Sequence, residues 1–231
     1  MVVDFSKSMS DTVILANGAA YPYPSGDPAS EGNNKVMKFY ISRKKEVETQ
    51  RVPSKLIEYP KPKLSDASHT RYIAMYEYTS DIDEPIHLYI NGKRYEAPVT
   101  EKPKVGSTEI WYVINLTEDN HPLHIHLGLL AALDQTELVR LEEFKDCMTK
   151  KNDAVKCKIE QHARGKRIKV SSHEKGWKNV YKMMPGYVTK ILVRFSNIQS
   201  NASYPFDATA EPGYVYHCHV SSKFILLTKC F

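Results

Sequence analysis

The chain has 231 residues, enough for one large domain or for a complete domain and part of another. Hydrophobic residues make up 42% of it, which suffices for a packed core, and no apolar run is long enough to cross a bilayer. The net charge is +5, with a basic surplus between Lys145 and Lys182. No nucleic-acid motif or aromatic stacking pattern accompanies these basic residues, so we do not expect nucleic acid as a partner.

Short segments rich in β-branched and aromatic residues recur along the chain, and turn-forming residues separate them. These segments are residues 12–17, 35–42, 71–79, 86–90, 108–116, 187–195 and 213–220. Because helical periodicity is rare, the pattern predicts an all-β sandwich or barrel. Residues 133–178 are too long and polar for a hairpin, and we expect a surface excursion closed by Cys147 and Cys157.

A polar stretch with three prolines, residues 46–68, is typical of a linker between domains. Residues 1–45 carry too few strands for a stable domain, so we interpret them as the C-terminal remnant of one. Residues 69–220 are long enough for a complete β-domain, and residues 221–231 form an atypical tail. The first residues lack the pattern of a signal peptide, so the sequence as written predicts a cytoplasmic protein.

Two Asn-x-Ser/Thr tripeptides begin at Asn115 and Asn201. Such tripeptides are glycosylation acceptors in secreted proteins, but they also arise often by chance. They would matter only if the chain entered the secretory pathway.

Five of the nine histidines and one cysteine lie in two short strings, ninety residues apart. The first string contains His121, His124 and His126, and the second is His217, Cys218 and His219. Side chains in a strand alternate between faces, so the two histidines flanking Cys218 share one face and the thiol lies on the other. If the two strings are neighbouring strands, four imidazoles converge on one face. His121, beside Pro122 at the strand entrance, can turn to the cysteine face.

This combination of donor groups suits two metal sites joined by one strand. A thiolate with imidazoles is the ligand set of blue copper, whereas a cluster of imidazoles alone suits copper or zinc. The paired CxxC spacing of zinc fingers does not occur.

The strings HPLHIH and YVYHCHV resemble the two C-terminal copper motifs of multicopper oxidases, a family that includes laccases, ferroxidases and bilirubin oxidases. The neighbouring stretch NGKRYEAPVTEKPKVGSTEIWYVINLTEDN is similar to the plant low-phosphate-root group, which is related to the spore-coat laccases. The resemblance covers approximately residues 1–220. It implies a cupredoxin-like Greek-key sandwich, preceded by a partial cupredoxin domain.

The resemblance also implies copper as the cofactor and a role for each residue of the two strings. The implied ligands are His121 and Cys218 for type 1 copper, His124 for type 2 copper, and His126, His217 and His219 for the type 3 pair. The implied activity is oxidation of a small reducing substrate, either Fe(II) or a phenol, coupled to reduction of dioxygen. The resemblance further implies entry into the secretory pathway, with a location in the endoplasmic reticulum or outside the cell.

Two features depart from the family pattern. Lys223 and Thr228 stand where the family has another copper-binding histidine and an axial residue. The remaining histidines are isolated, at His69, His87, His162 and His173. The family completes its copper cluster with histidines from an N-terminal cupredoxin domain, so we expect the isolated chain not to reduce dioxygen at a useful rate.

Two alternatives to an oxidoreductase stay open. One is a non-catalytic β-domain that binds copper or zinc through the imidazoles. The other is an inert interaction module whose exposed former domain interface drives self-association.

Overall fold

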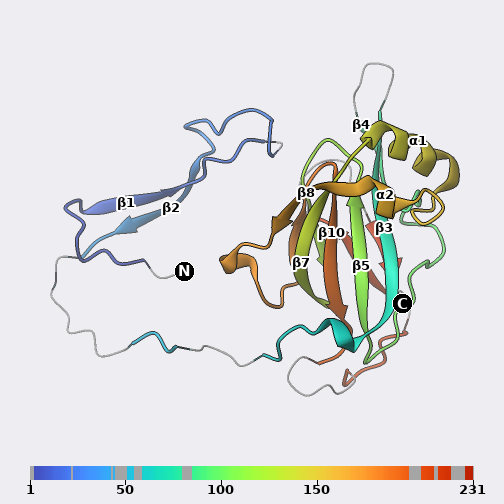
Figure 1. Ribbon diagram of the computed structural model, residues 1–231. Helices are drawn as coiled ribbons and strands as arrows, with labels where there is room; N and C mark the ends of the chain where they lie inside the picture. The colour runs from blue at the N-terminus through green and yellow to red at the C-terminus, as the bar shows by residue number, and fades with distance from the viewer. Residues whose placement is uncertain are drawn as a thin grey trace. The chain divides into compact units, whose positions relative to one another are not determined.

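The structure is a computed structural model that describes residues 3–21, 23–42, 44, 51–54, 59–79, 85–197, 204–210, 213–219 and 227–230. The chain divides into two compact units, Met1–Glu58 and Tyr59–Phe231. The first unit contains an antiparallel pair, β1 (Thr12–Ala16) and β2 (Lys35–Tyr40) (Figure 1). Most side chains of this pair are exposed, and two such strands do not make a stable domain by themselves.

The second unit is a sandwich of two sheets. Its strands are β3 (Ala67–Thr79), β4 (Pro85–Ile90), β5 (Thr108–Asn115), β6 (His121–Ile125), β7 (Leu129–Leu138), β8 (Ala163–Lys169), β9 (Val180–Met183), β10 (Tyr187–Arg194), β11 (Tyr214–Cys218) and β12 (Leu227–Cys230). One sheet has the order β4-β3-β5-β10-β7-β8, and the other β12-β11-β6-β9. Strands β3 and β5 run parallel, and the other pairings are antiparallel. The predicted all-β class is confirmed.

The main hydrophobic core lies between the two sheets, because its buried residues come from both. Trp111 of β5 and Tyr216 of β11 are both fully buried. Their rings meet edge to face, with centroids 5.4 Å apart, a geometry that aromatic pairs favour. This contact ties the larger sheet to β11, the strand that carries the second histidine string.

The predicted closure by Cys147 and Cys157 is confirmed, but residues 133–178 are not a surface excursion throughout. Their first residues complete β7 and a later part forms the edge strand β8. Between these strands lie α1 (Leu141–Lys151) and α2 (Ile159–His162), followed after β8 by a 3₁₀ turn at Ser172–Glu174; another 3₁₀ turn, Leu64–Asp66, precedes β3. The sequence pattern missed α1 because its buried face consists mainly of two apolar residues four positions apart, Phe144 and Met148.

The two helices cover the outer face of the larger sheet (Figure 1). Phe144 and Met148 pack there with Ile114 of β5 and Val188 of β10, in a second hydrophobic cluster separate from the main core. Among the described residues, no helix combines the length and apolar character needed to span a bilayer.

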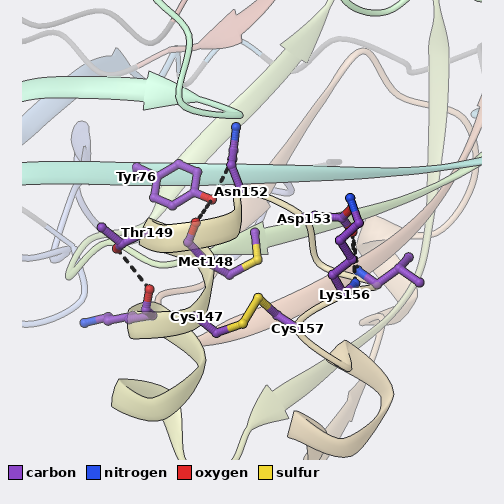
Figure 2. The surroundings of a disulfide bond; sticks show 10 residues. Tyr76, Cys147, Met148, Thr149, Asn152, Asp153, Lys156 and Cys157 are labelled. Carbon is purple, nitrogen blue, oxygen red and sulfur yellow. Dashed lines mark hydrogen bonds and ion pairs between the residues drawn. A yellow bond between two sulfur atoms is a disulfide. The ribbon is translucent and has the colours of Figure 1, made fainter.

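Cys147 of α1 and Cys157, two residues before α2, form a disulfide (Figure 2). The loop that this disulfide closes is also fixed to the sheet through Asn152. The hydroxyl of Tyr76 on β3 donates a hydrogen bond to Asn152 Oδ1 at 2.8 Å, and Asn152 Nδ2 donates to the carbonyl of Asn91 at 2.7 Å. We call α1, α2 and the loop between them the helical cap. A disulfide cross-links this cap internally, and hydrogen bonds attach it to the larger sheet.

We expect replacement of both Cys147 and Cys157 by serine to lower the free energy of unfolding by about 2–3 kcal/mol, because a cross-link over 10 residues restricts the unfolded chain. Chemical denaturation of the wild type and the double variant measures the difference. Thr149→Ala is the matched control, since Thr149 is exposed on the same helix and its hydroxyl donates to the Lys145 carbonyl within that helix. Equal stability of the double variant and the wild type would contradict the assignment.

Candidate metal centre

The two histidine strings lie side by side, because β6 and β11 are antiparallel neighbours in the smaller sheet. His217 stands opposite His124, and Cys218 stands opposite Leu123. The pairing continues past the end of β11, where the His219 N–H donates to the Pro122 carbonyl at 2.8 Å. The neighbouring strands that the alternation argument required are therefore present.

Four imidazoles gather on the outer face of this strand pair, and we call them the imidazole cluster. Its members are His124, His126, His217 and His219. Centroids of neighbouring rings within it lie 4.7 to 5.2 Å apart. One ring nitrogen from each of His124, His217 and His219 lies within 4.8 Å of the others, and Nε2 of His126 is 3.2 Å from Nε2 of His217. Converging imidazole nitrogens are donors that copper and zinc accept.

Burial and mutual repulsion favour the neutral form of two of these rings, His126 and His217, by lowering the pKa of each. Burial lowers the pKa of His126, and the three neighbouring imidazoles lower it further. Burial also lowers the pKa of His217, against a hydrogen bond to the Cys218 carbonyl that raises it, and with added lowering by His219 and His124. Because a metal ion binds the unprotonated nitrogen, these lowered pKa values favour metal binding at neutral pH.

Backbone carbonyls set the tautomers of two rings in the cluster. A carbonyl only accepts hydrogen bonds, so Nδ1 of His124 must donate to the Asn179 carbonyl at 2.8 Å. By the same argument, Nδ1 of His217 donates to the Cys218 carbonyl at 3.1 Å. Each ring therefore keeps an unprotonated Nε2, and metal-binding histidines are commonly oriented in this way.

Cys218 lies on the opposite face of β11, which is the face turned to the core. It keeps its thiol and is buried, as is His121. The distance from Cys218 Sγ to Nδ1 of His121 is 3.1 Å. Burial lowers the pKa of His121 to about 4, so its ring is neutral at pH 7. The pair offers one sulfur and one imidazole nitrogen, which fit copper.

The remaining histidines take no part in either group of donors. His69 and His87 on the larger sheet are exposed, as is His173 in its 3₁₀ turn. His162 is buried, but its Nδ1 donates to the Val139 carbonyl at 3.1 Å. Within the described residues, these four histidines lie apart from the imidazole cluster.

The two departures from the family pattern lie near or beyond the limits of the described residues. Lys223 falls outside them. The backbone of Thr228 pairs with that of Tyr216, on the side of β11 away from β6.

Sequence reasoning did not identify two groups that orient the histidines. The Asn179 carbonyl belongs to the backbone, so no residue type could have signalled it. Thr117 bonds His121, with Oγ1 2.7 Å from Nε2. Its signal was the Asn-x-Thr tripeptide at Asn115, which sequence reasoning considered only as a glycosylation acceptor.

A β-sandwich with an imidazole cluster outside and a thiol–imidazole pair inside has the fold and donor groups of a cupredoxin-like copper protein. The family model described as multicopper oxidase matches residues 66–224, more than half of the chain. The chain belongs to the multicopper oxidase family.

The chain is similar to two plant relatives and to one solved structure. Multicopper oxidase LPR2 of Arabidopsis thaliana is 68% identical over 220 residues, which are 95% of this chain and 38% of that protein. Multicopper oxidase LPR1 of the same plant is 66% identical over 222 residues, with the same shares covered. The crystal structure of the McoA multicopper oxidase from Aquifex aeolicus is 17% identical and has a TM-score of 0.61, over 99% of this chain and 42% of that one. This last likeness concerns the fold alone.

We expect the chain to bind a divalent ion at the imidazole cluster. The variant His217→Ala should weaken that binding by roughly 100-fold or more. Loss of a group that merely orients a ligand costs about 10–100-fold, and His217 lies centrally in the cluster. Calorimetric titration with zinc or copper measures the dissociation constant. His173→Ala, an exposed histidine away from the cluster, should leave the constant unchanged. Equal constants for both variants would contradict the site.

Proposed function

We propose that this chain is the C-terminal copper-binding part of a multicopper oxidase-type oxidoreductase. The assigned ligands are His121 and Cys218 for type 1 copper, His124 for type 2 copper, and His126, His217 and His219 for the type 3 pair. Bound copper would supply one-electron oxidation of a reducing substrate, coupled to reduction of dioxygen to water.

The observation that carries the proposal is the position of Cys218 between two members of the imidazole cluster. Its side chain turns into the core beside His121, while His217 and His219 turn outward. The buried sulfur and the outer imidazoles are therefore joined by one peptide bond on either side. An electron entering at the buried pair would have a covalent path to the cluster without crossing solvent.

The domain organisation is part of the proposal, because the chain spans only 38% of the length of the plant relatives. We assign residues 1–45 to the end of a middle cupredoxin domain, 46–68 to a linker, 69–220 to the C-terminal domain and 221–231 to a tail. The boundary between the two compact units lies within the proposed linker, which supports this assignment. An N-terminal cupredoxin domain would supply the other histidines of the copper cluster.

The proposed substrates are dioxygen and a small reductant, Fe(II) or a phenol, as the family resemblance implies. The proposed location is an oxidising compartment, either the endoplasmic reticulum or the extracellular space. The disulfide between Cys147 and Cys157 supports that location, since disulfides persist where thiols are not kept reduced.

A second candidate function is a non-catalytic copper- or zinc-binding β-domain. The observation that favours it is the close approach of His124, His217 and His219, which provides three imidazole donors without Cys218. The two candidates differ in whether the sulfur of Cys218 binds the metal.

Visible absorption and oxygen uptake distinguish these functions. For the copper-loaded chain we expect a thiolate-to-copper absorption band that disappears in Cys218→Ser. Bound copper without such a band in the wild type would favour the non-catalytic domain instead.

Oxygen uptake is measured with Fe(II) or a phenol as reductant. We expect no useful uptake by the chain alone, and uptake when the chain forms part of a longer protein with the N-terminal cupredoxin domain. In that longer protein, Cys218→Ser should lower turnover by at least roughly 100-fold, because it removes a copper ligand. Rapid uptake by the isolated chain would show that the cluster needs no further histidines.

A further inference from the structure

We infer that Thr117 is a positioning residue that fixes the tautomer and ring orientation of His121, and that Asn115 in turn holds Thr117. The inference rests on the proposed function only in assigning His121 to a metal ion. The hydrogen bonds that carry it belong to the chain itself.

Both nitrogens of the His121 ring have close partners in the buried interior. Nε2 lies 2.7 Å from Thr117 Oγ1, and Nδ1 lies 3.1 Å from Cys218 Sγ. A neutral imidazole carries one proton, so one nitrogen is a donor and the other has a lone pair. The direction of the Thr117 hydroxyl proton decides which of the two ring nitrogens carries the proton.

The hydroxyl of Thr117 is surrounded by groups that determine its direction. Asn115 Oδ1, 2.8 Å from Oγ1, has no proton to donate, and two oxygens this close repel each other unless a proton lies between them, so the single hydroxyl proton points to Asn115 Oδ1. The Asp119 carbonyl, 3.2 Å from Oγ1, is also only an acceptor. The Asp119 N–H donates to Oγ1 at 3.3 Å. Oγ1 therefore accepts from Nε2–H of His121.

The amide of Asn115 cannot turn over to reverse this pattern. Its Nδ2 donates to the Asp119 carbonyl at 2.7 Å and to the Met183 carbonyl at 2.8 Å, which uses both amide protons. Its Oδ1 accepts from the Thr117 N–H at 2.9 Å. The side chain of Asn115 is fully buried, so water does not compete for these bonds.

The same bonds explain the tripeptide Asn115-Leu116-Thr117. In the folded chain the Asn115 amide is buried and both of its protons are used, so a glycan on this nitrogen is incompatible with the structure. Its asparagine and threonine serve His121 instead. The second tripeptide, at Asn201, lies outside the described residues.

The consequence for metal binding follows from the tautomer. With the proton at Nε2, the lone pair of Nδ1 points towards the space beside Cys218 Sγ, where a shared metal ion would bind. The other tautomer would place a proton there. Thr117 thus fixes the His121 ring in the form that can bind a metal ion together with Cys218. Its loss would leave both the tautomer and the rotation of that ring undetermined.

Nuclear magnetic resonance of histidine-labelled, metal-free chain tests the tautomer directly. Long-range nitrogen–proton correlations should show the Nε2–H form for His121 in the wild type and in Thr117→Ser, which keeps the hydroxyl. Thr117→Val, of similar shape, should give a mixture or the Nδ1–H form. The matched control is Thr189→Val, at another fully buried threonine whose hydroxyl bonds Gln135.

Three results would overturn the inference. The first is an Nδ1–H form in the wild type, a measurement that needs no variant to fold. The second is an unchanged Nε2–H form in a folded Thr117→Val chain. The third is a tautomer change in Thr189→Val equal to that in Thr117→Val, since a general effect of losing a buried hydroxyl would then explain it.

Cobalt(II) binding, followed by Cys218-dependent absorption, separates this inference from the proposed function. We expect Thr117→Val to weaken binding roughly 10–100-fold and Thr117→Ser to restore it. An unweakened constant in Thr117→Val overturns the positioning role. If the wild type gives no Cys218-dependent absorption at all, the proposed function fails, while the resonance experiment still decides the tautomer.

Discussion

The register between β6 and β11 is the constraint on which the candidate site depends. A slip by one residue would move every side chain of a strand to the opposite face, taking the imidazoles into the core and the core residues into solvent. The core prevents such a slip, because Leu123, Ile125, Tyr216 and Cys218 all face inward and are buried. The imidazole cluster is thus positioned by buried residues that are not members of it. Packing energy and donor geometry depend on the same alternation of faces.

The two donor groups occupy different environments, and the chain orients each by different means. The imidazole cluster is partly exposed, and backbone carbonyls of Asn179 and Cys218 are enough to orient two of its rings. His121 is buried, where an unpaired polar nitrogen would be costly. It therefore has a dedicated side-chain partner, Thr117. The exposed cluster remains open to donors from outside the chain, whereas the buried pair is orientated internally.

The sequence predicted most of the site because the strand period is two, a local property. His124 and His126 are two residues apart, as are His217 and His219. Each pair therefore lies on one face of its strand, which can be stated without knowledge of the fold. The helical cap was not predictable, because Phe144 and Met148 are isolated apolar residues in a charged segment. They define a buried face of α1 only because the larger sheet packs against them. The role of Thr117 was equally hidden, since it depends on carbonyls brought together by tertiary structure.

The elements that stabilise the fold and those that would carry out chemistry lie in different layers. The helical cap, with its disulfide, covers the outer face of the larger sheet, whereas the imidazole cluster lies on the smaller sheet. The core between the two sheets contains the contact of Trp111 with Tyr216, and neither residue belongs to the imidazole cluster. Loss of a single donor therefore does not require loss of the sandwich. Membership of the family follows from the sandwich and its sequence, while electron transfer requires the full set of donors. In this chain, fold and activity are consequently separable properties, and each needs its own experiment.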